Sequence, residues 1–153
     1  MNKQNSTIMK LAETALLAAL CYVSFTFLQI KIPVPGGDAT SLHIGNTFCV
    51  LGALLLGGWY GGLAGSIGMT IADLMDPVYI TGAPKTFVLK LCIGLITGLV
   101  AHKIAKINET NDKKYVFKWS LIASIAGLAF NAVSYTHLRA HETIAHLVRR
   151  LLL

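Results

Sequence analysis

The chain has 153 residues, 54% of them hydrophobic and 13% charged, with a formal net charge of +6 and a mean hydropathy of +0.62. An average soluble domain is about 25% charged, and a core of this length cannot hide so much apolar surface, so the composition excludes an ordinary soluble domain. The positive charge does not form the stripe of basic and aromatic residues typical of nucleic-acid binding, which excludes that partner as well.

Apolar runs in the chain predict an all-α, polytopic membrane bundle. Four runs are expected to span the bilayer, with a fifth starting near Tyr115: Ile8–Ile30, Leu42–Gly57, Tyr60–Met75 and Thr86–Ile104. A span needs roughly 17 to 25 residues, so the second and third are short unless the Gly-rich turn between them is buried. The first run is too long for a signal peptide and has no convincing small-residue cleavage site, so we expect a retained helix.

The lysines predict the orientation of the bundle. If the spans alternate, the N-terminal segment and the loop Lys103–Lys118 share one side and hold most lysines, whereas the opposite loops hold only Lys31 and Lys85. The positive-inside rule then places the N-terminus in the cytoplasm and the loops Pro33–Ser41 and Asp76–Pro84 outside. This is the arrangement of a multi-pass protein of the cell membrane.

Small residues recur where helices are expected to approach one another closely, because a small side chain lets backbones pack tightly in lipid. Two series lie in the middle of the chain: Ala53, Gly57, Gly61 and Gly65, then Gly94 and Gly98. Ordinary packing within the chain is the favoured interpretation of these glycines. Ala15 and Ala19 have the same spacing in the first helix, where packing and chance are both open.

The three cysteines are expected to be small core residues. Cys21, Cys49 and Cys92 all lie inside apolar runs and show no paired spacing. This pattern favours neither disulfides nor metal ligands, and we expect no metal and no cofactor.

Polar residues inside the spans predict a site, because each costs roughly 2.5–3.5 kcal/mol at mid-membrane and normally faces the bundle interior. Three sets each share a helical face at a similar depth: His43 with Asn46, Thr70 with Asp73, and Thr86 with Lys90 and Thr97. If the helices pack as a bundle, these faces converge on an outward-opening pocket. The alternatives are that Asp73 and Lys90 only neutralise each other, and that His43 caps a helix or faces lipid headgroups.

The chain changes character at about Ala132, after which come all three arginines and three of the five histidines. Residues Val133–Thr143, VSYTHLRAHET, resemble the translation of a transposase-type sequencing adapter, and Leu147–Leu153 resembles its outer end with Arg149 as a departure. We therefore expect residues 1–131 to be the natural domain, truncated in its fifth helix, and residues 132–153 to be a non-native, adapter-derived tail. The alternative is a native basic amphipathic tail lying on the membrane surface.

Four segments of residues 8–131 together resemble a known family. They are the first helix with Ala15 and Ala19, the loop KIPVPGGDAT (Lys31–Thr40), the run Leu42–Phe48 followed by Leu54–Gly65, and APKTFVLK (Ala83–Lys90). These segments are similar to the S component, the substrate-binding subunit, of energy-coupling factor (ECF) vitamin transporters.

The resemblance implies a bundle of six helices, of which about five are present here, that captures a vitamin or vitamin precursor from outside. It implies that Ala15 and Ala19 contact a transmembrane coupling subunit, which two ATPase subunits drive. It also implies a lid over the pocket, formed by Pro33, Pro35, Gly36, Gly37, Asp38 and Thr40. The chain itself carries no Gly-x-x-x-x-Gly-Lys-Ser/Thr phosphate loop, so we expect a transport subunit that is not an enzyme and whose energy comes from its partners.

The candidate substrate-binding residues are His43, Asn46, Asp73, Tyr79, Thr86 and Lys90. Phe48, Tyr79 and Phe87 can stack on a flat ring, which predicts a heteroaromatic vitamin such as riboflavin, pyridoxine or a hydroxymethylpyrimidine. Two other classes stay open on the sequence. One is a membrane-embedded lipid-headgroup enzyme using Asp73, Asp76 and His43, and the other is a small homo-oligomeric exporter or channel.

Overall fold

The computed structural model describes the backbone of residues 3–33, 39–77 and 79–151, and the side chains within 5–29, 44–77, 79–80 and 82–138. The elements in chain order are α1 (Lys3–Phe27), β1 (Gln29–Pro33), β2 (Ala39–His43), α2 (Gly45–Leu56), α3 (Gly58–Met75), the 3-10 helix η1 (Ile80–Gly82), α4 (Ala83–Gly98), the π-helix η2 (Leu99–Ile104) and α5 (Lys113–Leu151). Helices dominate this part of the chain, which confirms the predicted all-α class.

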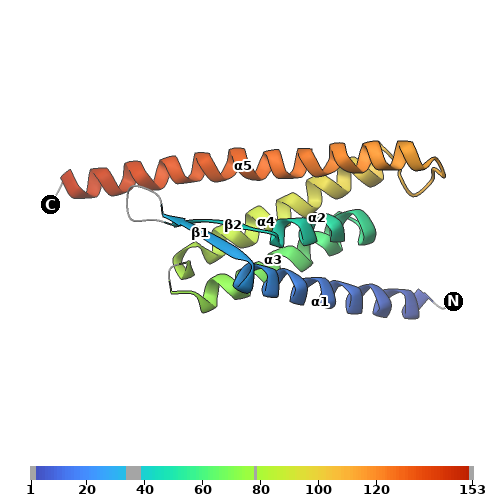
Figure 1. Ribbon diagram of the computed structural model, residues 1–153, viewed down its shortest axis with the longest axis horizontal. Helices are drawn as coiled ribbons and strands as arrows, with labels where there is room; N and C mark the ends of the chain where they lie inside the picture. Colours follow the sequence, from blue (N-terminus) through green and yellow to red (C-terminus); the bar gives the residue numbers. More distant parts are fainter. Residues whose placement is uncertain (1–2, 34–38, 78, 152–153) are drawn as a thin grey trace.

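The helices run back and forth along one axis (Figure 1). α3 packs against α1, α2 and α4, and α4 packs in turn against α5. The start of α1 marks one end of the bundle, which we call the N-terminal end. The end of α1 and the β1–β2 hairpin mark the other, which we call the hairpin end.

In the part of the chain that the structure describes, three helical stretches are long and apolar enough to cross a membrane: Asn5–Phe27, Ala83–Ile104 and Lys113–Leu138. α2 is apolar but has only 12 residues, and α3 has 18. The second apolar run is therefore as short as predicted, whereas α3 begins at Gly58, before the predicted Tyr60, and reaches the lower limit of a span. The molecule has the helices of a polytopic membrane protein.

The β1–β2 hairpin replaces two helix ends that the sequence predicted. Gln29–Pro33 pairs with Ala39–His43 in antiparallel register, so that Gln29 lies opposite His43 and Pro33 opposite Ala39. The predicted first span extended to Ile30 and the predicted second span began at Leu42, and both boundaries are wrong. The physical reason is that the hydrogen bonds of a strand ladder satisfy the backbone there in place of a helical turn.

The interface between α3 and α4 is built from glycine on both sides. A Cβ atom on Gly94 would overlap the backbone of Gly62, and one on Gly98 would overlap the backbone of Gly58. No other residue type allows two helix backbones to come so close. The prediction of close packing within the chain is thereby confirmed for Gly94 and Gly98.

The turn between α2 and α3 is equally tight. Gly57 alone separates the two helices, and its φ of 95° lies in the region that favours glycine. A Cβ atom on Gly61 would overlap the backbone of Ala53, and one on Gly65 would overlap the thiol of Cys49. The four-residue series of small residues therefore packs α2 against α3, as predicted.

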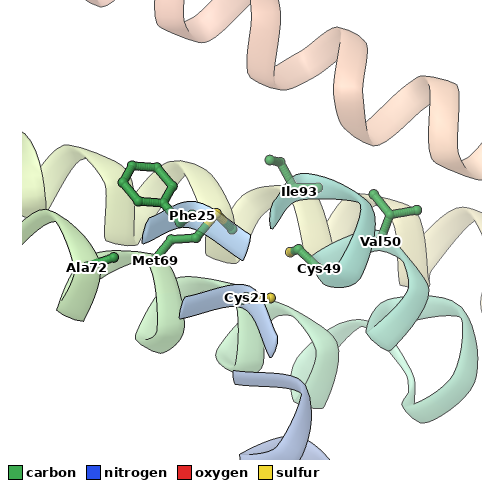
Figure 2. Packing of buried hydrophobic residues seen from close by; sticks show 7 residues of the cluster. All are labelled: Cys21, Phe25, Cys49, Val50, Met69, Ala72 and Ile93. Atoms are coloured by element: carbon green, nitrogen blue, oxygen red, sulfur yellow. The ribbon is translucent and has the colours of Figure 1, made fainter. Parts of the chain in front are cut away.

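Four helices contribute to the main hydrophobic core (Figure 2). Its buried residues are Cys21, Phe25, Cys49, Val50, Met69, Ala72 and Ile93. Cys21 and Cys49 are fully buried free thiols, which confirms their placement in the core, while Cys92 is half-buried. The Cys49 thiol lies 3.5 Å from the carbonyl oxygen of Lys90, and so joins α2 to α4.

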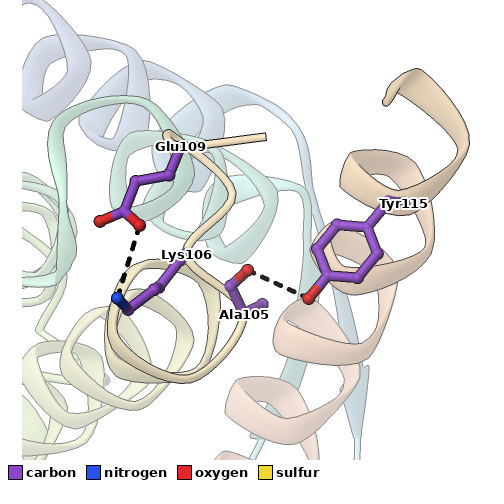
Figure 3. A network of polar contacts seen from close by, with 4 residues as sticks. All are labelled: Ala105, Lys106, Glu109 and Tyr115. Atoms are coloured by element: carbon purple, nitrogen blue, oxygen red, sulfur yellow. Dashed lines mark hydrogen bonds and ion pairs between the residues drawn. The ribbon is translucent and has the colours of Figure 1, made fainter. Parts of the chain in front are cut away.

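α5 is anchored at its start by the loop that precedes it (Figure 3). The Tyr115 hydroxyl donates to the carbonyl oxygen of Ala105 at 3.3 Å. Within the loop, the Lys106 ammonium and a Glu109 carboxylate oxygen lie 3.4 Å apart. This short connection fixes where α5 begins relative to the end of η2.

Farther along, α5 lies directly on α4. A Cβ atom on Gly127 would overlap the Thr97 hydroxyl. The helix then continues through Ala132 to Leu151 without a break, and Figure 1 shows this last part extending past the other helices beside the hairpin. The adapter origin of residues 132–153 stays a prediction.

Candidate functional site

A carboxyl group and an ammonium group are buried inside the bundle toward the hairpin end. Asp73 of α3 is 3% exposed and Lys90 of α4 is 8% exposed. Thr86, one helical turn before Lys90, lies close to the Asp73 carboxyl group. The structure therefore brings together three side chains that helical spacing had placed at a similar depth.

Asp73 and Lys90 lie within electrostatic range of each other, yet these two described side chains do not form an ion pair. An ion pair does form elsewhere, in the exposed Lys106–Glu109 contact. The other ionisable neighbours of the Lys90 ammonium are the thiols of Cys49 and Cys21. Direct neutralisation of Asp73 by Lys90, the alternative left open by the sequence, is therefore not the arrangement found.

Several buried oxygen atoms toward the hairpin end have no hydrogen-bond partner. They are Oδ1 of Asn46 at the start of α2, Oε1 of Gln29 at the start of β1, and Oγ1 of Thr70 on α3. An unsatisfied buried polar group costs about 1–3 kcal/mol, and native proteins keep few of them. Such atoms mark a place where a polar ligand gains hydrogen bonds that the protein alone leaves unmade.

His43 does not share a helical face with Asn46, so that prediction is wrong. The backbone of His43 belongs to β2, and α2 begins only at Gly45. The change from strand to helix between these residues breaks the three-residue helical spacing on which the prediction rested. The side chain of His43 lies outside the described part of the chain.

The predicted lid coincides with the hairpin. Pro33 ends β1, and Thr40 lies in β2 opposite Ile32. The remaining lid residues, Pro35, Gly36, Gly37 and Asp38, lie outside the described residues. A lid role for this segment stays a prediction, and its described ends, Pro33 and Thr40, lie in paired strands at the hairpin end.

A cleft of about 530 Å³ opens between the ends of α1 and α3. We call it the hairpin-end cleft, and its lining includes Phe25, Thr26, Gln29, Met75 and Asp76. The Tyr79 ring, a predicted binding residue, packs edge-on against Phe25 with 6.3 Å between ring centroids. The cleft thus combines aromatic, amide and carboxylate groups beside buried Asp73.

An apolar groove of about 510 Å³ runs along the same two helices toward the N-terminal end. We call it the α1–α3 groove. Ala15 and Ala19 line it and are exposed, together with Leu11, Tyr22, Ile67 and Ile71. The two alanines predicted to contact a partner therefore face an open groove and do not pack against another part of the bundle.

Two polar residues of structural interest were missed by sequence reasoning. Gln29 carries one of the unsatisfied oxygens, and the alternation of polar and apolar residues from Gln29 to Ile32 was a strand signal. His102 places Nε2 3.0 Å from the carbonyl oxygen of Ala53, in the last turn of α2. No local signal identifies that contact, because 49 residues separate its partners in the chain.

The described residues hold no group of three or more His, Cys, Asp or Glu side chains placed to bind a metal ion. Asp73 and Asp76 lie within electrostatic range of each other. Asp73, however, is buried near Thr86, whereas Asp76 lines the cleft. These two acids give no added support to a metal-dependent lipid-headgroup enzyme.

Comparison with known proteins finds a family whose sequence model matches most of the chain. The sequence model of the family described as "ECF-type riboflavin transporter, S component" matches residues 5–148. A relative from Pyrococcus woesei, described as an uncharacterized protein in the gap 3′ region, is 34% identical over 76 residues. That alignment covers 50% of this chain and 49% of the relative, so the chain spans about half the length of the curated relative it matches. No solved structure matches the chain.

Proposed function

Because the chain belongs to the family of ECF-type riboflavin transporter S components, we propose that it captures a vitamin or vitamin precursor outside the cell. An ATP-driven coupling module then drives import of the bound vitamin. The proposed binding residues are Asn46, Asp73, Thr86 and Lys90, with Tyr79 at the hairpin-end cleft.

The main support for this proposal is that Lys90 is buried without an ion-pair partner among the described residues. A charged side chain inside a membrane bundle is expensive and normally pairs with another group. Lys90 is only 8% exposed, and Asp73 lies near it without forming an ion pair. A ligand acceptor placed between the two would give the ammonium its missing hydrogen bond and leave Asp73 with Thr86.

The lining of the cleft supports a flat heteroaromatic ligand. Phe25 lines the cleft and Tyr79 packs edge-on against it, so both offer aromatic rings, and Gln29 in the lining offers an amide oxygen without a partner. Asn46, at the start of α2, carries another such oxygen. A ring with polar atoms on its edge uses both kinds of group. Riboflavin, which the family description names, is of this kind, as are pyridoxine and hydroxymethylpyrimidines.

The orientation and the partners complete the proposal. The lysine distribution favours an N-terminus in the cytoplasm and a hairpin outside, an orientation in which the cleft opens toward the vitamin. The α1–α3 groove, with Ala15 and Ala19, receives the transmembrane coupling subunit, and two ATPase subunits supply the energy. Small residues suit a reversible contact, because they lose little side-chain entropy on association.

The test is the replacement Lys90→Met, which keeps the length of the apolar stem and removes the ammonium. We expect affinity for the bound vitamin to fall about ten-fold to a hundred-fold, since a hydrogen bond to a charged group contributes roughly 1.5–3 kcal/mol. Isothermal titration against riboflavin, pyridoxine and a hydroxymethylpyrimidine measures this. Lys103→Met, an exposed lysine beyond α4, is the matched control and should bind as the parent protein does.

Two results would contradict the proposal. Parent-like affinity in Lys90→Met, together with misfolding of Asp73→Asn that Lys90→Met rescues, would make the pair structural. A stable homo-oligomer that copurifies with no ATPase-containing complex and binds none of the three vitamins would favour an exporter or channel.

A further inference from the structure

The interface between α1 and α3 is hollow at two places along its length. The hairpin-end cleft lies at one, with Phe25 and Gln29 facing Met75 and Asp76. The α1–α3 groove lies at the other, with Ala15 and Ala19 facing Ile67 and Ile71. Figure 1 shows the two helices side by side over this stretch. Any movement of the end of α3 relative to α1 would therefore change the shape of both hollows.

One side-chain contact stands between the two hollows. The Tyr22 hydroxyl donates to the sulfur of Met75 at 3.2 Å. Tyr22 is part of the groove lining, whereas Met75 is part of the cleft lining. The residues that meet in this bond thus belong to different hollows.

The two helices touch at one point within the α1–α3 groove, whose lining includes Ala18 and Gly68. A Cβ atom on Gly68 would overlap the carbonyl oxygen of Ala18, so the backbones of α3 and α1 touch there. Tyr22 lies one helical turn beyond Ala18 on α1, and Met75 lies about two turns beyond Gly68 on α3. The Ala18–Gly68 contact can therefore act as a fulcrum, with the Tyr22–Met75 bond closing the interface on its hairpin side.

We propose that the Tyr22–Met75 contact links occupancy of the cleft to the shape of the groove, with Tyr22 as the positioning residue. This inference rests on the proposed function, because it takes the cleft as the vitamin's mouth and the groove as the partner's docking surface. A ligand against Met75 and Asp76 holds the end of α3 at one distance from α1. Through the Tyr22 hydroxyl, that distance sets how far the groove is open to a partner helix.

The opening of the α1–α3 groove can be measured without the coupling subunit. Ala15→Cys puts a thiol on its exposed wall, and Cys92→Ala removes the half-buried native thiol, leaving Cys21 and Cys49 fully buried. The rate at which a fluorescent maleimide labels position 15 in detergent micelles then reports the opening of the groove. The same sample is titrated with riboflavin, pyridoxine and a hydroxymethylpyrimidine, and binding is measured independently by calorimetry.

We expect a bound vitamin to change the labelling rate at position 15 about two-fold to ten-fold, the range that one neutral hydrogen bond can transmit. Tyr22→Phe, which keeps the ring and removes the hydroxyl, should still bind the vitamin but lose this response. Met75→Leu should lose it too, and the double variant should lose no more than either single one. Tyr115→Phe removes a comparable hydroxyl contact, to Ala105, and should keep the full response.

The results separate a failure of the Tyr22–Met75 link from a failure of the proposed function. Vitamin binding with the same labelling response in Tyr22→Phe as in the parent overturns the link and leaves the proposed function standing. Vitamin binding with no labelling response in the parent protein does the same. Absence of binding to all three vitamins contradicts the proposed function, and with it the link that rests on it.

Discussion

The two sides of α3 are built in opposite ways. Toward α4, glycines at Gly58 and Gly62 face Gly94 and Gly98, and the backbones touch. Toward α1, the helices touch at Gly68, which itself lines the groove of about 510 Å³, and a cleft of about 530 Å³ opens toward the hairpin end. The closed side holds Asp73, Thr86 and Lys90 at fixed spacing, and the open side leaves room for other molecules. A small membrane bundle can thus keep a rigid site and an adaptable surface on a single helix.

The largest effect on stability is expected from overpacking the interface between α3 and α4. Gly94→Ala places a methyl group in the backbone of Gly62, and overpacking against backbone that cannot move should lower the free energy of unfolding by about 3 kcal/mol. Gly82→Ala is the matched control, because nothing lies within 4 Å of a Cβ atom there, and it should change stability by less than about 0.5 kcal/mol. Denaturant titration in micelles compares them, and equal stabilities would show that α4 can shift away from α3.

Bulky side chains in the α1–α3 groove should weaken partner binding and leave the free energy of unfolding largely unchanged. Ala15→Trp together with Ala19→Trp should reduce copurification of the coupling subunit at least ten-fold, because bulky rings hold a docking helix away from the groove. Leu20→Trp changes another exposed position of the same helix and should copurify normally. Undiminished recovery of the partner with the double variant would mean that this alanine face only meets lipid.

A smaller effect is expected inside the site. Asn46→Ala should weaken vitamin binding about three-fold to ten-fold, since it removes one neutral hydrogen bond to the ligand. Without vitamin the same change should leave the free energy of unfolding unchanged or raise it by up to about 1 kcal/mol, because Oδ1 of Asn46 has no partner in the protein. Asn108→Ala, exposed in the loop before α5, should change neither. If Asn46→Ala lowers stability without lowering affinity, the ligand does not contact Asn46 on α2.

The depth of the charged residues was predictable from the sequence, and their surroundings were predictable only in part. Asp73, Thr86 and Lys90 lie on regular helices, so helical spacing placed them at one depth and the structure brings them together. His43 failed because the strand pairing with Gln29 depends on a residue 14 positions away. The groove was suggested by Ala15 and Ala19, but its second wall on α3 depends on how the two helices pack. Long-range pairing and packing are the parts that periodicity does not encode.

The smallest effect is expected from the end of α5. Among the contacts of the described residues, ending the chain after Ala132 removes the Lys85–Tyr135 cation–π contact, with 5.6 Å between Nζ and the ring centroid. Such a contact contributes about 0.5–1 kcal/mol, and we expect stability to fall by about that amount. Thermal unfolding of the two chain lengths measures this. We propose that residues 132–153 come from adapter DNA. Amplification across the codons of Asn131 and Val133 from adapter-free source DNA tests this, and recovery of the same tail would refute it.

The single-residue link at Gly57 has a mechanical consequence. With one residue between them, α2 and α3 cannot separate, and the glycine contacts bind α4 to α3 just as firmly. These three helices form one rigid unit, against which α5 packs both near its start, at Tyr115, and farther along, where Gly127 meets Thr97. If the molecule changes shape as it works, we expect the distance between Asn46 and Lys90, which both belong to this unit, to stay constant.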